Sequence, residues 1–317
     1  MEAIDIAGMR VSRIGFGCAA IGGHDYGPVD DAVSRRAVAA ALDAGITLFD
    51  VADIYGLGHA ESILAEALGE RRKDVVIATK FGVRWDAQKG ATFRDISPGY
   101  LRQALETSLR RMRLDCIPLY QVHWLDGVTP LSDALEELAR CRQAGKVRAI
   151  GLSNIDPREH AGAIKDHRVD TIQLPFSLVD AAHSASFDHG RDRLGLTTIA
   201  YNALAHGFLS GKYSRESVFS GPDLRARKNS FLNGDTEAHW RIVEILRSAA
   251  DRLQTTPAQI AIRWVLDHPS VGCVLVGVKD AAQARQNADA LRLGLQPDVV
   301  ADLNAAVKSF SDCGDGS

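Results

Sequence analysis

The sequence has no excess of charge of either sign, and this absence excludes proteins whose surface coats a polyanion. Its 317 residues include 37 Lys and Arg against 40 Asp and Glu, so the formal net charge is −3. A surface that binds nucleic acid normally carries a clear basic excess. We therefore expect no nucleic-acid partner.

Cysteine is also scarce, and its pattern excludes a disulfide-rich scaffold. The five cysteines are odd in number and scattered, and no C-x-x-C occurs. This usage is typical of a reducing compartment. No H-E-x-x-H occurs and no H-x-H ends the first predicted strand, so we expect no metal site.

Long apolar runs are missing as well. No stretch approaches the ~20 apolar residues of a membrane-spanning helix. The first residues are acidic rather than basic and then apolar, which is unlike a signal peptide. We therefore expect a cytoplasmic protein without a membrane partner, while the oligomeric state is left open.

What the sequence does contain is a regular alternation of short apolar runs with longer amphipathic stretches. Eight runs rich in Val, Ile, Leu or Phe are typical of strands buried on both faces. They are Ile14–Cys18, Ile46–Asp50, Val75–Lys80, Leu119–His123, Val147–Leu152, Thr171–Leu174, Thr197–Tyr201 and Gly272–Val276. Helices between the strands imply parallel pairing, and eight is the number that closes a (β/α)8 barrel.

The stretches between the runs carry helix signals. The segment Asp30–Ala44 is followed by Gly45, a C-terminal signal. Ser97 and Pro98 open another helix, because the hydroxyl can cap free N–H groups and proline suits the first position. Pro130–Ala144 has leucines and alanines at helical spacing on one face. The chain thus alternates strand and helix.

An open doubly wound sheet is the competing fold. Its dinucleotide fingerprint, G-x-G-x-x-G, fails here because after Gly15 and Gly17 the next glycine, Gly22, comes too late. The sequence therefore predicts one TIM barrel domain over residues 1–317. Three segments fall outside the alternation: a hairpin cap at 1–12 with Ala7-Gly8-Met9 as its turn, a long active-site loop at 214–237, and a frayed tail at 311–317.

Polar residues at the strand ends are the candidates for chemistry, because barrel sites lie at the carboxyl ends of the strands. Lys80 ends an apolar strand, where a charge is costly unless an acid pairs with it, and Asp50 ends the neighbouring strand. Tyr55 and His123 belong to the same mouth. An ammonium stabilises a phenolate and an imidazole can orient a carbonyl oxygen, so these residues suit proton transfer to an oxygen. A purely structural ion pair is the alternative.

Six segments of the sequence resemble the signatures of the aldo-keto reductase family. They are Ala41–Leu68 (ALDAGITLFDVADIYGLGHAESILAEAL), Val76–Gly82 (VIATKFG), Gln121–Trp124 (QVHW), Gly145–Asn154 (GKVRAIGLSN), Tyr201–Tyr213 (YNALAHGFLSGKY) and Val276–Leu291 (VGVKDAAQARQNADAL). The likeness covers nearly the whole chain. Four catalytic positions in order on successive strands make it specific.

The resemblance implies a catalytic tetrad of Asp50, Tyr55, Lys80 and His123. Tyr55 would be the general acid in reduction or the base in oxidation. Lys80, held by Asp50, would tune the pKa of Tyr55, and His123 would orient the substrate oxygen. The implied reaction moves a hydride between a nicotinamide cofactor and a carbonyl or alcohol, such as an aldehyde, a ketone or a sugar-like aldose.

The resemblance also implies a cofactor site. Ser153, Asn154 and Gln173 would hold the nicotinamide carboxamide, and Tyr201 would stack on its ring. Taken without the family, the first two suit a helix cap and Gln173 suits a core amide. The further implied cofactor contacts are Gly17, Cys18, Asn202, Leu204, Gly207, Gly277, Lys279, Gln283 and Asn287.

The segment implied to bind the adenosine end of the cofactor departs from the commonest family pattern. Lys279 is basic, but Asp280 follows it, and Gln283 stands where many members have Arg. A carboxylate beside a phosphate is unfavourable, although Asp280 can also cap a helix. NADP is therefore slightly preferred and NAD stays open.

Aromatic residues near the mouth suggest the substrate walls. These are Tyr26, Trp85 and Trp124, with parts of Ser214–Phe231. Two alternatives to a reductase remain: a non-catalytic regulatory subunit that keeps the cofactor site, and a phosphate-handling barrel isomerase. The isomerase would leave Tyr55 and Lys80 without a shared role.

Overall fold

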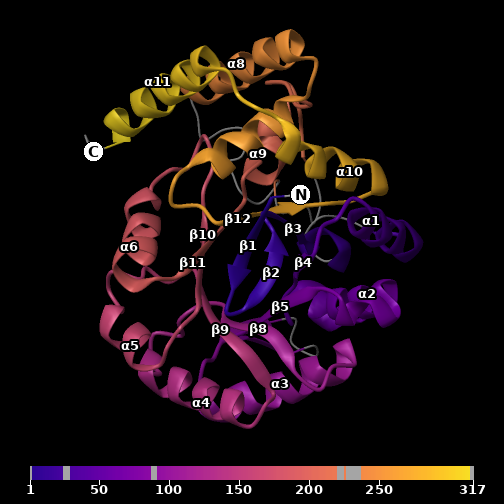
Figure 1. Cartoon of the computed structure of the whole chain (residues 1–317), viewed down its shortest axis with the longest axis vertical. Helices are drawn as coiled ribbons and strands as arrows, with labels where there is room; N and C mark the ends of the chain where they lie inside the picture. Colours follow the sequence, from indigo (N-terminus) through magenta and orange to yellow (C-terminus); the bar gives the residue numbers. More distant parts are fainter. Residues whose placement is uncertain (1, 24–28, 87–90, 220–224, 226–236, 315–317) are drawn as a thin grey trace.

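The eight predicted strands close into a single barrel. The computed structural model describes residues 2–23, 29–86, 91–219, 225 and 237–314. All pairs in the barrel are parallel, in the order β10-β11-β12-β3-β4-β5-β8-β9 (Figure 1). The strands are β3 (Ile14–Gly17), β4 (Leu48–Asp50), β5 (Val76–Phe81), β8 (Ile117–Val122), β9 (Val147–Ser153), β10 (Thr171–Pro175), β11 (Thr197–Tyr201) and β12 (Cys273–Gly277). The expected (β/α)8 TIM barrel is confirmed.

Helices surround the barrel and begin where their caps predict. Asp30 accepts a hydrogen bond from the backbone N–H of Ala32, and Ser97 accepts one from that of Tyr100. The helices are α1 (Asp31–Asp43), α2 (His59–Leu68), α3 (Pro98–Met112), α4 (Leu131–Gln143), α5 (Ala161–Asp166), α6 (Ser184–Leu194), α8 (Glu237–Leu253), α9 (Pro257–Asp267), α10 (Ala281–Asp289) and α11 (Pro297–Gly314). Each predicted helix therefore forms within one or two residues of its expected ends.

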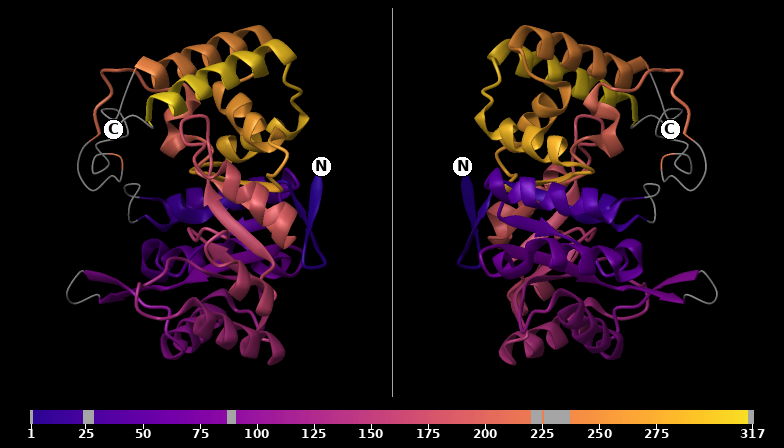
Figure 2. Two further views of the ribbon diagram at one scale, coloured as in Figure 1. Left: turned by 90° about the vertical axis from the view of Figure 1, so that its left-hand side faces the viewer. Right: turned by 90° about the vertical axis from the view of Figure 1, so that its right-hand side faces the viewer.

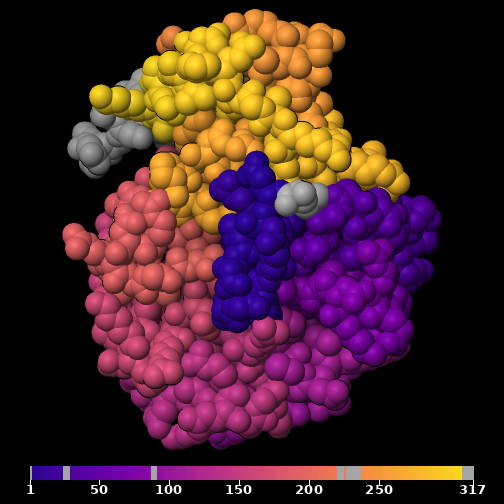
Figure 3. Space-filling view, in the orientation of Figure 1, coloured from indigo at the N-terminus to yellow at the C-terminus, as the bar shows by residue number. Residues whose placement is uncertain are grey.

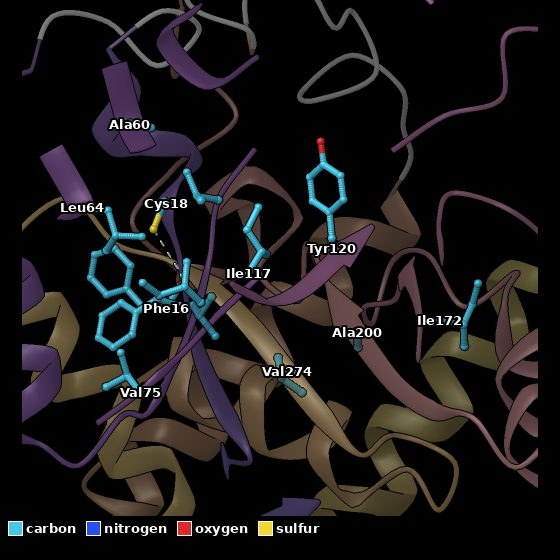
Figure 4. Packing of buried hydrophobic residues seen from close by; sticks show 14 of the residues in the cluster. Phe16, Cys18, Ala60, Leu64, Val75, Ile117, Tyr120, Ile172, Ala200 and Val274 are labelled. Carbon is cyan, nitrogen blue, oxygen red and sulfur yellow. Dashed lines mark hydrogen bonds between the residues drawn. The ribbon is translucent and has the colours of Figure 1, made fainter. Parts of the chain in front are cut away.

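The main core lies between the barrel wall and these helices. The rings of Phe16 and Phe49, on neighbouring strands, lie 5.6 Å apart and face this layer. Figure 4 shows Phe16 and Cys18 beside Leu64 of α2. Burying such side chains on the outer face of every strand stabilises the closed barrel through the hydrophobic effect.

The N-terminal hairpin closes one end of the barrel, as expected. Strands β1 (Ala3–Ile6) and β2 (Met9–Ser12) pair antiparallel and lie across the barrel end (Figures 1 and 3). The turn is Ala7-Gly8, both with positive φ, so Met9 belongs to the strand and not to the turn as expected. Apolar hairpin and strand residues form one buried cluster there: Ile6, Met9, Val11, Leu48, Val76, Ala78, Leu119, Ala149, Ile199, Cys273 and Leu275.

Two features, a second hairpin and a pair of outer helices, were not expected. Strands β6 (Val83–Asp86) and β7 (Ala91–Arg94) form a second hairpin after β5, which projects from the side opposite to the N-terminal hairpin (Figure 2). Helices α8 and α11 pack together outside the ring of helices (Figure 1). Residues 311–314, expected to be frayed, continue α11, while most of the 214–237 loop lies outside the described residues. No described helix is long and apolar enough to cross a membrane.

Candidate active site

The inward-facing side chains of β4 and β5 change from apolar to polar along each of these two strands. Side chains two residues apart point to the same face of a strand. On β5 the inward positions run from Val76 and Ala78 in the apolar cluster to Lys80, and on β4 they run from Leu48 to Asp50. The polar residues therefore gather at the carboxyl ends, opposite to the N-terminal hairpin.

Asp50 and Lys80 form a buried ion pair at this end. Lys80 Nζ lies 2.5 Å from Asp50 Oδ1, and the two side chains are 5% and 1% exposed, the lysine being the more buried. Lys80 also donates to the carbonyl oxygen of Val51, at 3.0 Å. Asp50 Oδ2 accepts hydrogen bonds from the side-chain amides of Gln121 at 3.2 Å and Gln173 at 2.8 Å. Both charges are thus compensated, as burial requires.

Tyr55 is positioned by two turns that pack backbone against backbone. It opens η2 (Tyr55–Gly58), which contacts η1 (Cys18–Gly22). Gly56 has a φ of 59°, and a Cβ added to it would lie 2.2 Å from the carbonyl oxygen of Gly22. Only glycine fits this contact. The Tyr55 ring, half-buried at the mouth, lies with its centroid 5.3 Å from Lys80 Nζ.

His123 completes the predicted group directly after β8. Its ring meets that of Tyr55 edge to face, with centroids 6.0 Å apart and an interplanar angle of 83°. Burial lowers the pKa of His123 well below its usual value, and the positive charges of Lys80 and Arg94 lower it further. Nδ1 is buried and, among the described residues, has no hydrogen-bond partner. The imidazole is therefore neutral at neutral pH.

These four side chains, all predicted from the sequence, meet at one place. An ammonium close to a phenol favours the phenolate, and a neutral imidazole can hydrogen-bond to an oxygen without adding charge. The arrangement can therefore deliver a proton to, or take one from, an oxygen held between Tyr55 and His123.

The residues expected to hold a carboxamide lie beside this group. Asn154, with a φ of 58°, donates to the carbonyl oxygen of His123 and to Ser153 Oγ, each at 3.1 Å. Its Oδ1 accepts from the hydroxyl of Tyr201, at 2.6 Å. Gln173 uses its Nε2 for Asp50 and Gln121, while its Oε1 takes part in no hydrogen bond seen among the described residues.

The other expected cofactor residues fall into two loops. Asn202, with a φ of 60°, leads into η4 (Ala205–Ser210), where it accepts from the backbone N–H of His206 and where Gly207 has a φ of 97°. Leu204 is half-buried between them. Gly17 and Gly277 are register partners on β3 and β12, and Cys18 is fully buried behind them.

The loop before α10 explains two of the departures from the family pattern. Asp280 caps the helix by accepting from the backbone N–H of Gln283, at 2.9 Å. Gln283 Oε1 accepts in turn from the backbone N–H of Lys279, at 3.0 Å. Asn287 is buried within α10. Asp280 is therefore engaged with its own helix.

The expected substrate walls are only partly together. Trp124 stacks against His123, with ring centroids 6.2 Å apart. Trp85, on β6, instead has its ring 5.4 Å from the guanidinium of Arg111 on α3. Tyr26 lies outside the described residues.

Sequence reasoning missed Gln121 and Arg94. Gln121 precedes His123 by two residues and so shares its inward face, a signal that was present in the period of the strand. Arg94 lies on the unexpected hairpin, its guanidinium 4.8 Å from the Trp124 ring. No sequence signal pointed to Arg94, because the hairpin itself was not expected.

A sequence profile described as the aldo/keto reductase family matches residues 13–308. The chain belongs to the aldo/keto reductase family. It is 33% identical over 315 residues to the aldo-keto reductase YhdN of Bacillus subtilis, covering 98% of this chain and 94% of the relative. It is 30% identical over 302 residues to the fission yeast (Schizosaccharomyces pombe) aldo-keto reductase yakc [NADP(+)], covering 93% and 88%.

Solved structures agree with this membership in the aldo/keto reductase family. The structure of the glycerol dehydrogenase AKR11B4 from Gluconobacter oxydans superposes with a TM-score of 0.88 at 32% identity, covering 97% of this chain and 95% of that one. The holo form of the aldo-keto reductase AKR11C1 from Bacillus halodurans gives 0.80 at 25% identity, covering 96% of each chain. The family places the chain among oxidoreductases.

Proposed function

We propose that this reductase-family chain transfers a hydride between a nicotinamide cofactor and a carbonyl or alcohol, with Tyr55 as the general acid or base. One observation carries the proposal. The Lys80 ammonium, held by Asp50 at 2.5 Å, lies 5.3 Å from the Tyr55 ring. A phenol with an unperturbed pKa near ~10 moves protons poorly at neutral pH. The nearby ammonium stabilises the phenolate and so makes the transfer easier.

His123 takes the orienting part. Its lowered pKa keeps the imidazole neutral, so it can hydrogen-bond to the substrate oxygen without competing with Tyr55 as a proton donor. The edge-to-face contact at 6.0 Å holds the His123 and Tyr55 rings on the same side of the mouth. A carbonyl oxygen between them receives the proton of Tyr55 in reduction and returns it in oxidation.

The residues near Asn154 fit a nicotinamide headgroup. A carboxamide needs donors and acceptors; Ser153 Oγ accepts from Asn154, while Gln173 Oε1 makes no hydrogen bond among the described residues. Ser153, Asn154 and Gln173 would hold the amide, and Tyr201 would lie against the ring. When bound, the nicotinamide supplies or takes up the hydride.

We propose NADP as the slightly preferred cofactor, with NAD as the other candidate. Lys279 supports a phosphate contact, and one relative carries NADP(+) in its name. The carboxylate of Asp280 caps α10 by accepting from the backbone N–H of Gln283. Its negative charge therefore counts less against a phosphate bound nearby. Titration with each cofactor tests the preference. Lys279→Ala should weaken NADP binding selectively, and equal losses for both cofactors would remove Lys279 from this role.

The substrate class is a small aldehyde, ketone or sugar-like aldose. Aromatic surface beside His123 supports it, and a related structure is named a glycerol dehydrogenase. If the enzyme turned over only apolar ketones, the proposal of an aldose substrate would be contradicted. A cytoplasmic location stays a prediction.

The test of the reaction is the reduced-nicotinamide absorbance with a panel of carbonyls. Tyr55→Phe should lower kcat/KM by ~10²–10⁴-fold, the usual contribution of a general acid. Tyr120→Phe is the matched control, because among the described residues the buried hydroxyl of Tyr120 has no partner and borders the helix layer. An unchanged rate in Tyr55→Phe would show that the proposed acid is wrong. Cofactor binding without turnover of any carbonyl would favour the regulatory subunit.

A further inference from the structure

A cationic side chain reaches the candidate active site from the β6–β7 hairpin. Arg94, the last residue of β7, places its guanidinium 4.8 Å from the centroid of the Trp124 ring. Trp124 in turn stacks on His123, with ring centroids 6.2 Å apart. The Trp124 indole is thus a shared neighbour of the Arg94 guanidinium and of His123, which borders the proposed oxygen site.

The guanidinium of Arg94 is available to a ligand. The residue is exposed, and no ion pair joins it to a carboxylate in the part of the chain that the structure describes. Stacking occupies the face of a guanidinium and leaves the N–H groups at its edge open. Arg84, one residue from the register partner of Arg94, points to the opposite face of the hairpin and contacts Asp95 at 3.8 Å.

The charge of Arg94 also acts on the site electrostatically. After burial and Lys80, it is the third cause that lowers the pKa of His123. This agrees with the contacts that Arg94 and His123 both make with Trp124, which place an anion bound at Arg94 in the neighbourhood of a carbonyl held at His123.

We propose that Arg94 is a specificity residue that binds a carboxylate of the substrate, so that the preferred substrates are aldehydes carrying a carboxylate a few bonds from the carbonyl. The planar fork of a guanidinium matches the two oxygens of a carboxylate. Trp124, which contacts both Arg94 and His123, would lie against the apolar part that joins the two groups. This inference rests on the proposed reaction, whose substrate class it narrows.

The experiment compares 4-carboxybenzaldehyde with its neutral methyl ester, methyl 4-formylbenzoate. The readout is the change, from wild type to variant, in the ratio of kcat/KM for the acid to kcat/KM for the ester, because the different intrinsic reactivities of the two aldehydes cancel in that comparison. In Arg94→Ala this ratio should fall about tenfold, mainly through KM, as expected for loss of a charge-assisted hydrogen bond at an exposed site. An unchanged ratio would overturn the proposal.

Two variants sharpen the reading. Arg84→Ala removes a cation from the other face of the same hairpin and should leave both substrates unaffected, whereas a fall in its ratio equal to that of Arg94→Ala would reduce the effect to general charge and contradict the proposal. Arg94→Lys keeps the charge but loses the planar fork, so its ratio should lie between wild type and Arg94→Ala. Added salt should lower the wild-type ratio of kcat/KM for the acid to that for the ester, because salt screens the attraction between guanidinium and carboxylate.

A binding measurement separates this proposal from the proposed reaction. Calorimetric titration of the chain with 4-carboxybenzaldehyde and with the ester needs no turnover. Binding of the acid that is tighter than that of the ester and weakened by Arg94→Ala supports the carboxylate site even if no hydride transfer is seen with either cofactor. Equal binding of acid and ester would overturn the site, whatever the reaction rates.

Discussion

Two ion pairs, each with a buried carboxylate, are tied to neighbouring residues of β5 and lie on opposite sides of the barrel wall. Lys80 points inward and pairs with Asp50. Thr79 points outward and donates to Glu61 Oε1 at 2.8 Å, while Glu61 Oε2 accepts from Arg111 at 3.0 Å. The first pair joins two strands, and the second joins α2 to α3 across the outer face of β5.

The surroundings of the two pairs differ more than the pairs themselves. The inner pair borders Tyr55 at the open mouth, where its charge acts on a group that can exchange protons. The outer pair is covered by the ring of Trp85 and holds helices together. The comparison teaches that the side of the wall sets the neighbours of each pair: the inner pair adjoins the phenol that we propose as the proton donor, and the outer pair joins two helices.

The largest expected effect tests the inner pair. Lys80→Met should lower kcat/KM by ~10²–10⁴-fold, because the charge that eases proton transfer at Tyr55 is lost. The fold should survive with reduced stability, since Asp50 loses its counter-charge but keeps the amide donors of Gln121 and Gln173. Steady-state kinetics and a thermal melt of the same sample check both statements. Lys73→Met, at an exposed lysine paired with Glu70, is the control.

A Lys80→Met enzyme with near-normal kcat/KM would break the comparison, because the inner pair would then be structural. The double variant Asp50→Asn, Lys80→Met sharpens it. Removing both charges avoids an uncompensated carboxylate, so stability should recover toward that of the wild type while activity stays low.

The next effect concerns the outer pair and should be asymmetric. Arg111→Met leaves Glu61, which is 0% exposed, as an uncompensated buried charge, and should cost ~3–5 kcal/mol of unfolding free energy. Glu61→Gln should cost less, ~1–3 kcal/mol, because Arg111 is 23% exposed and water can hydrate it. Urea unfolding measures both. Equal costs would contradict this account, as would a large loss of kcat per folded molecule.

The difference between the two pairs also shows what sequence reasoning could reach. Lys80 was conspicuous because it ends an apolar strand, and the strand order then placed Asp50 beside it. Glu61 and Arg111 are charged residues in amphipathic helices, where a solvent-exposed position is the ordinary expectation. Only the packing of α2 on α3 brings these two residues together beneath Trp85, 50 positions apart in sequence.

The barrel strands were predictable for the same physical reason. A strand such as Cys273–Gly277 (CVLVG) is buried along most of its length, so its sequence is an apolar run whose ends are visible. No residue of the strands β6 and β7 is fully buried, so Val83–Asp86 and Ala91–Arg94 contain no apolar run that marks them. Arg94, the cation at the mouth, lies on β7, so its position could not be predicted without predicting that hairpin.

The smallest expected effect concerns Asp53, which lies between the two pairs. Its backbone N–H donates to the carbonyl oxygen of Lys80 at 3.3 Å, and Oδ1 is buried without a partner among the described residues. Burial raises the pKa of Asp53 well above its usual range, and the charge of Glu61 raises it further. Between the ordinary and the raised pKa the folded chain holds a proton that the unfolded chain lacks. The free energy of unfolding therefore falls as pH rises through this window.

Asp53→Asn removes this titration, so its stability should decline less with pH than that of the wild type. Above the ordinary pKa of an aspartate the two curves should diverge as the pH rises, because the folded wild type holds a proton that its unfolded chain has lost, and one such proton is worth ~1.4 kcal/mol per pH unit. Urea unfolding at several pH values measures the divergence. In a Glu61→Gln variant that keeps Asp53, the decline of the unfolding free energy should move to lower pH, because the Glu61 charge that raises the pKa of Asp53 is gone. Parallel curves for the wild type and the Asp53→Asn variant would contradict a raised pKa of Asp53 in the folded chain.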